Sequence, residues 1–208
     1  MMIVKKHLLL AGLIALAGLL VDGPADAQRK PPPKPINGAE NGVYLKAALP
    51  LDEPRHLCVD IPGHGGRVNV TRDMVVHSCK EGIWNLDERF VKSSIKTHDL
   101  KMPQYNLCLV AREAKAGARL GLTKCGSSKL AKWDFKEARL TLQGHPDLCL
   151  TIGPEPSALT PGGKRLPSRN KARSLAMDTC SEAALERQLW TFADPLNITK
   201  PLMPPKGM

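Results

Sequence analysis

Six cysteines are the residues of this chain best suited to covalent or metal chemistry. An even number of cysteines in an oxidising compartment predicts three disulfides. A structural zinc site is disfavoured, because no two of them show the close Cys-x-x-Cys spacing that such sites use. The number alone leaves the pairing open. The six are Cys58, Cys79, Cys108, Cys125, Cys149 and Cys180.

Other catalytic constellations do not appear in the sequence. It contains no Ser-His-Asp signature, paired-carboxylate motif or phosphate-binding loop, and its six histidines are dispersed. We therefore expect a non-enzymatic protein with no cofactor and no metal.

The cysteines belong to a pattern that returns three times along the chain. The copies read "HLCVDI … MVVHSC … IWNL", "NLCLVA … RLGLTKC … KWDF" and "DLCLTI … SLAMDTC … QLWTF". Each has Leu-Cys before an apolar residue, a short segment ending in Cys, and then a tryptophan. These tryptophans, Trp84, Trp133 and Trp190, are all that the chain contains, and we expect them in the core. Such periodic self-similarity predicts an internal repeat.

The elements of each copy are expected to be strands. Segments such as "LCLVA", "RLGLT" and "LCLTI" are short, apolar or alternating, and bounded by Gly, Pro, Asp or Ser. In "ARLTLQG", Leu140 and Leu142 fall on one face of a half-buried strand. Three copies of several short strands predict an all-β, closed arrangement that leaves no exposed edges.

The ends of the chain differ in composition from the repeats. Residues 1–27 combine Lys5, Lys6 and His7, an apolar run and Ala25-Asp26-Ala27, as in a secretory signal peptide cleaved near Ala27. An uncleaved anchor is disfavoured, because the run is shorter than the ~20 residues of a spanning helix. We expect a secreted or periplasmic protein with no transmembrane segment in the mature chain. Residues 28–42 and 196–208 are Pro-rich and predicted to be flexible, flanking a folded domain at 43–195.

The chain is basic, with a formal net charge of +10. This favours anionic partners. Nucleic acid is disfavoured, because aromatic residues make up only 4% and are assigned to the core. Residues 153–174 form a Gly/Pro-rich basic segment that we expect to be solvated and mobile. It is either a solubilising insertion or a contact for an anionic partner; its cations are Lys164, Arg165, Arg169, Lys171 and Arg173.

Together, the Leu-Cys, Cys and Gln-x-Trp motifs resemble the ricin B-type lectin family over residues 43–195. Gln188-Leu189-Trp190 is complete, whereas Gly82-Ile83-Trp84 and Ala131-Lys132-Trp133 lack the glutamine. The resemblance implies a β-trefoil of three pseudo-symmetric repeats. It also implies three structural disulfides within the repeats, Cys58–Cys79, Cys108–Cys125 and Cys149–Cys180.

The resemblance further implies a sugar site in each repeat, built from an Asp after the first Cys, an aromatic residue and an Asn beside the Gln. The first copy has Asp60 and His77, with Glu81-Gly82 for the Asn-Gln pair. The second has apolar Val110 and Leu130-Ala131 there and is predicted to bind no sugar.

The third copy has Thr151, Asp178 and Arg187-Gln188 at these positions. The candidate carbohydrate-binding residues are therefore Asp60, His77, Arg187 and Gln188. Two other interpretations remain open: Asp60 could cap the turn before "PGHGG", and Gln188 could bond only to backbone.

Two function classes remain. The first is a carbohydrate-binding module for an acidic or galactose-type glycan. The second is a protein-interaction trefoil, such as the delivery subunit of a multi-chain toxin or an inhibitor-like trefoil, whose Pro-rich ends dock a partner protein.

Overall fold

The computed structural model describes residues 31–205, and the predicted signal peptide lies outside the described residues. Within them the regular elements are strands and 3-10 helices, as expected for an all-β protein. No helix in this range is long and apolar enough to cross a membrane. The strands are β1 Val43–Ala47, β2 Leu57–Asp60, β3 Val75–Ser78, β4 Arg89–Phe90, β5 Lys101–Met102, β6 Leu107–Ala111, β7 Leu120–Lys124, β8 Trp133–Lys136, β9 Arg139–Leu142, β10 His145–Ile152, β11 Ala158–Leu159, β12 Lys171–Thr179 and β13 Trp190–Ala193.

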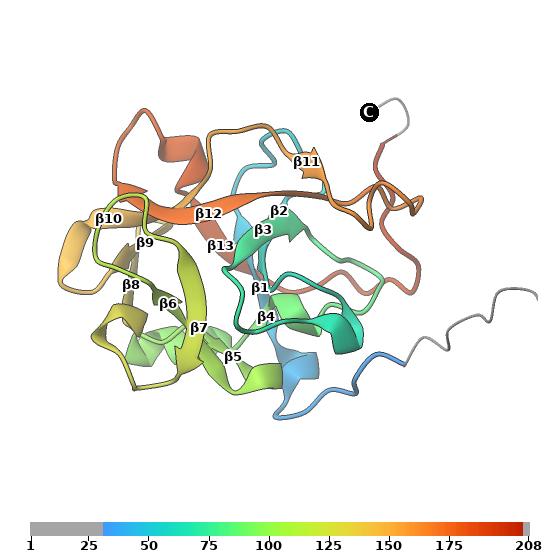
Figure 1. Cartoon of the computed structure of the whole chain (residues 1–208), viewed down its shortest axis with the longest axis horizontal. Coiled ribbons are helices and arrows are strands. Elements are labelled where there is room, and N and C mark those ends of the chain that lie inside the picture. Colours follow the sequence, from blue (N-terminus) through green and yellow to red (C-terminus); the bar gives the residue numbers. More distant parts are fainter. Residues whose placement is uncertain (1–30, 206–208) are drawn as a thin grey trace, which may run out of the picture. The chain divides into compact units, whose positions relative to one another are not determined.

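The strands pair antiparallel in two curled sheets (Figure 1). The larger sheet has the order β13-β1-β2-β3-β12-β10-β9-β8, with β11 beside β12 and β4 beside β1. The smaller sheet has the order β5-β6-β7. Long strand β12 joins two parts of the chain, because one end pairs with β3 and the other with β10.

Seven short 3-10 helices connect the described strands. Three of them each come shortly before a strand, one in each repeat: η3 before β4, η6 before β8 and η7 before β13. The helices are η1 Ala39–Asn41, η2 Gly65–Arg67, η3 Leu86–Glu88, η4 Lys92–Thr97, η5 Pro103–Tyr105, η6 Lys129–Ala131 and η7 Leu185–Arg187.

Three disulfides link the cysteines in the pairing that the resemblance implied, which is confirmed. They join Cys58 to Cys79, Cys108 to Cys125 and Cys149 to Cys180. Each closes a local loop within one repeat, and such a link typically contributes about 2–4 kcal/mol. All six cysteines are therefore used in structural bonds.

Two of the three tryptophans lie in the core, as expected. Trp133 and Trp190 are fully buried, and their indole N–H groups donate to the carbonyl oxygens of Leu109 and Leu150 at 3.0 and 2.9 Å. Each acceptor is the residue directly after the first cysteine of its own repeat. This shared contact fixes the tryptophan against the strand that carries the disulfide.

The expectation that Trp84 belongs to the core is wrong. Its side chain is only partly buried, its indole donates to Pro33 O at 3.0 Å, and its ring meets the His64 ring edge-on. The fully buried ring at the equivalent place in the first repeat is Phe90, which follows η3 as Trp133 follows η6. Phenylalanine fills the volume without an N–H donor, and a repeat pattern defined by tryptophan does not include it.

Both ends of the described chain contact the folded domain. Gln104 bonds Lys34 O and the Ile36 N–H, at 3.0 Å each. At the other end, Glu81 accepts hydrogen bonds from the N–H groups of Leu196 and Leu202. The sequence predicted flexible ends, and the structure places residues 31–36 and 196–202 against the domain.

A glycine is required where the tail crosses the first repeat. Gly82 has φ +70, and a Cβ there would lie 1.9 Å from the backbone oxygen of Lys200. The turn therefore needs both the left-handed backbone that glycine tolerates and the missing side chain.

The basic segment 153–174 differs from the expected mobile loop. It contains β11 and the start of β12, which pair with each other. The buried Arg55 guanidinium donates to Ser168 O at 2.7 Å, Asn170 Oδ1 at 3.0 Å and Arg169 O at 3.4 Å. These backbone and side-chain bonds satisfy polar groups that a solvated loop would leave to water.

Candidate functional site

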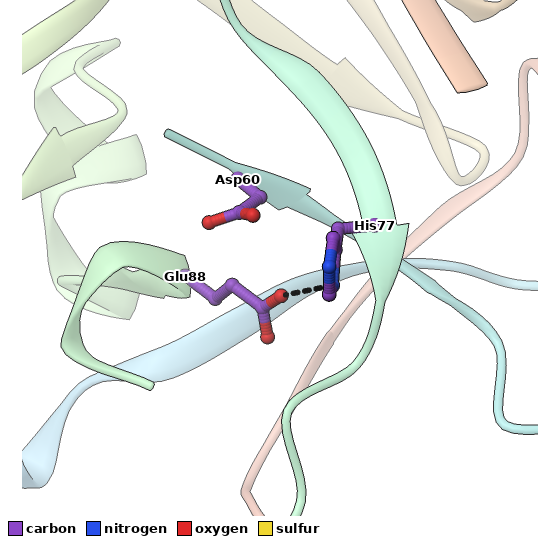
Figure 2. Close-up of side chains that lie close together, drawn as sticks. All are labelled: Asp60, His77 and Glu88. Carbon is purple, nitrogen blue, oxygen red and sulfur yellow. Dashed lines mark ion pairs between the residues drawn. The ribbon is translucent and has the colours of Figure 1, made fainter. Parts of the chain in front are cut away.

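The structure brings Asp60 and His77 together in the first repeat. β2 and β3 pair so that Cys58 lies opposite His77 and Asp60 lies opposite Val75, which puts both candidate side chains on one face. Figure 2 shows them converging with Glu88, which comes from η3. One donor atom from each of the three lies within 4.8 Å of the others. All three side chains are buried.

Lys80 fills the centre of this cluster. Its Nζ donates to Asp60 Oδ1 and Oδ2 at 2.9 and 3.0 Å and to Asp87 Oδ2 at 2.6 Å. The same atom lies 3.9 Å from Glu88 Oε1. The Lys80 ammonium thus supplies, from within the chain, the positive charge that a bound cation would otherwise bring to these carboxylates.

Burial and mutual repulsion govern the charges of the cluster. Burial raises the pKa values of Asp60 and Glu88 well above their usual range, although Lys80 opposes this. Burial alone would lower the pKa of Lys80, but the carboxylates of Asp60, Asp87 and Glu88 outweigh it and raise that pKa. Burial lowers the pKa of His77. The arrangement therefore keeps Lys80 charged and His77 neutral at pH 7, with a proton held among the acids.

The sequence alignment of the first repeat placed the Asn-Gln pair at the wrong residues. Glu88 accepts a hydrogen bond from the N–H of Lys80, the residue after the second cysteine, at 2.9 Å. Gln188 accepts the equivalent bond from the N–H of Ser181 at 3.1 Å. The pair is therefore Asp87-Glu88, six residues beyond the predicted Glu81-Gly82.

Sequence reasoning therefore missed three residues of the cluster, Lys80, Asp87 and Glu88. A signal was present in "DERF", residues 87–90, which matches Asn-Gln-x-Trp by one conservative change at each defined position. The buried lysine had no such signal, because a charged residue next to a cysteine usually faces water.

In the third repeat, Gln188 is buried and fully engaged. Its amide nitrogen donates to Thr151 Oγ1 at 3.0 Å and to Thr179 O at 2.9 Å, while its oxygen accepts from Ser181. Gln188 thus makes the backbone bonds that the alternative interpretation expected, together with one bond to the Thr151 side chain. Asp178 is half-buried and bonds the neighbouring N–H of Thr179.

Arg187, the chain neighbour of Gln188, lines an open pocket of about 530 Å³ that Gln188 does not border. Its guanidinium donates to Ile152 O at 2.6 Å. Of the four candidate carbohydrate-binding residues, it is the one that borders this hollow. Besides two alanines, the lining consists of Leu51, Arg173, Glu182, Glu186 and Arg187.

Charges along this pocket are partly compensated. Arg173 is buried; it pairs with Asp52 at 3.3 Å and bonds Gly153 O, while its Nε has no hydrogen-bond partner among residues 31–205. Glu182 pairs with Arg139 at 2.8 Å. Arg187 makes no salt bridge within 4.0 Å among the described residues. Glu186 likewise makes no salt bridge among the described residues, so the pocket offers the donors of Arg187 beside one acidic acceptor.

The other predicted cations of segment 153–174 fall into two groups. Lys171 lies on β12 near Asp52, whose carbonyl it bonds at 3.4 Å. Lys164, Arg165 and Arg169 are exposed on the connection between β11 and β12. In the second repeat, Val110 is buried and Leu130 is partly buried, so that position presents only apolar side chains.

Comparison with known proteins shows likeness at the level of fold. No family model and no curated protein matches the sequence. Among solved structures, the agglutinin from Abrus precatorius matches with a TM-score of 0.51 and 14% identity over 73% of this chain. This chain spans about half of that protein, 48% of its length.

Two further solved structures match over nearly their whole length. An earthworm lectin C-terminal domain mutant, described in complex with 6'-sialyllactose, has a TM-score of 0.50 and 10% identity over 73% of this chain and 96% of its own. The mdaA-1 domain, solved in solution, has a TM-score of 0.53 and 13% identity over 80% and 95%. At these identities the likeness concerns the fold, which is shared with lectins.

Proposed function

We propose that this protein is a non-enzymatic carbohydrate-binding module of the ricin B type, built as a β-trefoil and working outside the cytoplasm. Fold likeness to two lectin structures supports the class. The three disulfides fit an oxidising compartment. The three equivalent Cys-loop-Cys repeats support the trefoil arrangement.

We assign glycan binding to the pocket of the third repeat. The observation that carries this assignment is Arg187, which borders the pocket at the position where the family resemblance puts a sugar-binding residue. In the first repeat, Asp60 already has both carboxylate oxygens bonded to Lys80. In the second, the matching positions are apolar. A glycan needs directed polar partners, and only the third repeat combines them with open space.

The ligand is an acidic glycan. Arg187 uses one of its five donors on Ile152 O, and the planar guanidinium matches a carboxylate or sulfate in a two-point contact. The chain's net charge of +10 favours approach of a polyanion. The earthworm lectin domain was solved with a sialylated sugar, which also carries a carboxylate.

A glycan array containing neutral galactosides and sialylated, uronic-acid and sulfated saccharides tests this function. We expect saturable binding to acidic members and a loss of at least about tenfold in affinity for Arg187→Ala, the size of one charge-assisted contact. Arg165→Ala is the matched control, because it removes the same charge from an exposed site outside the pocket.

Two outcomes would contradict the assignment. An array with no saturable binding rejects the carbohydrate function. Equal weakening by Arg187→Ala and Arg165→Ala rejects the pocket, because it indicates general electrostatic attraction.

A further inference from the structure

Lys80 is a primary amine held against three carboxyl groups inside the domain. Lys80, Asp60, Asp87 and Glu88 are at most 3% exposed. Asp87 Oδ1 and Glu88 Oε1 have no hydrogen-bond partner among the described residues. Buried carboxyl oxygens without partners are costly in a folded protein, which calls for an explanation.

The amine lies close to the carboxyl carbon of Asp60. Nζ is 2.9 Å from Oδ1 and 3.0 Å from Oδ2. With an ordinary C–O bond length, these two distances put Nζ within about 3.3 Å of Cγ, inside the range of a near-attack arrangement. Asp87 differs, since Nζ makes one short contact of 2.6 Å to Oδ2, which suits proton transfer.

We propose that Lys80 and Asp60 form an intramolecular amide bond, with Asp87 as the base and Glu88 as a proton relay. The Lys80 ammonium gives one proton to Asp87 Oδ2. The neutral amine then attacks Cγ of the protonated Asp60 carboxyl, forming the C–N bond. Glu88 carries the second nitrogen proton to the departing hydroxyl, the C–O bond breaks, and one water leaves. The amide and a protonated Asp87 remain, so no oxidant or reductant is needed.

The surroundings favour the attack on Asp60 and the loss of water. The three acids hold the Lys80 ammonium charged, so the transfer of its proton to Asp87 is the part of the step that costs free energy. Burial raises the pKa of Asp60, so its carboxyl is available in the neutral form, which accepts a nucleophile more readily than a carboxylate. Glu88 Oε1 is 3.9 Å from Nζ and 3.6 Å from His77 Nδ1, and it makes no hydrogen bond within the described residues. The product replaces a buried ammonium and an acid by a neutral amide, which removes a desolvation cost. Exclusion of water protects the amide from hydrolysis.

The bond would be a second link beside an existing disulfide. Asp60 is two residues from Cys58, and Lys80 follows Cys79 directly. Both links join the end of β2 to the segment after β3. The amide would keep this loop closed under reducing conditions, which the disulfide alone does not. The inference is independent of the glycan function.

Mass spectrometry of the full chain, reduced and unfolded, tests the proposal. We expect a mass about 18 Da below that of the reduced sequence, the loss of one water, and a branched tryptic peptide joining the Asp60 and Lys80 segments. A full sequence mass with no branched peptide overturns the proposal. A water lost inside the single peptide 73–89, located by fragmentation to Lys80 and Asp87, overturns the choice of Asp60. A water lost in a peptide without Lys80 overturns the cross-link.

Substitutions distinguish a loss of the amide bond from a loss of folding. Lys80→Arg keeps a cation but cannot form this amide, so we expect the full mass; Lys132→Arg is the control, since Lys132 contacts Asp99 at 3.1 Å in a more exposed place. Glu88→Gln introduces the residue of the third repeat and should slow bond formation at least tenfold. An unchanged rate overturns the relay role. If Lys80→Arg fails to fold, the peptide map of the natural chain still decides.

Discussion

Glu88 and Gln188 hold the same position in two repeats. Each accepts a hydrogen bond from the backbone N–H that follows its repeat's second cysteine, from Lys80 at 2.9 Å and from Ser181 at 3.1 Å. Their neighbours differ: Glu88 faces Lys80 and His77, whereas Gln188 donates to Thr151 and Thr179 O. One scaffold position thus carries an acid in one repeat and an amide in another.

We predict that Gln188→Glu destabilises the domain at pH 7 by about 1–3 kcal/mol, because a buried carboxylate would face the carbonyl oxygen of Thr179. The new acid would have a raised pKa in the folded state. The free energy of unfolding of the Gln188→Glu variant would therefore be higher in acid and fall as the pH rises through that pKa. Urea unfolding across the pH range measures this. Gln143→Glu, on an exposed glutamine, is the control, and an equal effect of both variants would contradict the prediction.

Trp190→Phe and Trp84→Phe should have different costs. The first leaves the buried carbonyl of Leu150 without its donor and opens space in the core, which we expect to cost about 2–4 kcal/mol. The second removes a bond to Pro33 O from a partly exposed side chain and should cost less than about 1 kcal/mol. Thermal and denaturant unfolding measure both. Similar costs would argue that Trp84 is a core residue.

Arg55→Lys should detach the connection between β11 and β12. Lysine keeps the charge but lacks the fork that reaches Glu53, Ser168 O and Asn170 together. We expect trypsin to cut between residues 164 and 171 well before global unfolding, and a loss of about 1–3 kcal/mol. Arg112→Lys, at an exposed pair with Asp73, should leave the cutting pattern unchanged. Resistance equal to that of the natural chain would sink the idea.

Asp52 should contribute stability that disappears in acid. Burial alone would raise its pKa, but two hydrogen bonds from Ser157 and the Arg173 guanidinium outweigh burial and lower it. A lowered pKa means that the stabilisation is present above the unfolded pKa and lost as the pH falls through the folded one. Asp52→Asn should therefore cost about 0.5–1 kcal/mol at pH 7, since the group is partly exposed, and nothing once Asp52 is protonated. A pH-independent difference would refute the assignment.

Removal of the disulfides should reveal the proposed amide. Replacing Cys149 and Cys180 by alanine should cost about 2–5 kcal/mol, because the unfolded chain loses a closed loop. Replacing Cys58 and Cys79 should cost less, because a bond between Asp60 and Lys80 would close almost the same loop. Equal losses in the two double variants, measured by denaturant unfolding, would speak against a second link.

The sequence by itself determined the elements that depend on local pattern. Cysteines repeated at similar places, with alternating apolar residues between Gly and Pro, predicted an all-β chain with its cross-links, and the family resemblance predicted their pairing. These features were readable because side-chain periodicity and turn residues act over a few neighbouring positions. The apolar character of the matching positions in the second repeat was readable for the same reason, since the side chains of Val110 and Leu130 carry no polar atoms.

Only the tertiary structure decided which side chains share a buried space. Lys80, Asp87 and Glu88 come from segments whose convergence depends on how β2, β3 and η3 pack, and no local pattern marks a lysine for the interior. The position of Trp84 was likewise settled by the N-terminal segment that contacts it through Pro33. Burial sets the pKa and the available partners of a charged group, and burial depends on how the whole chain packs. Packing made Asp60 part of an internal cluster and left Arg187 beside open space.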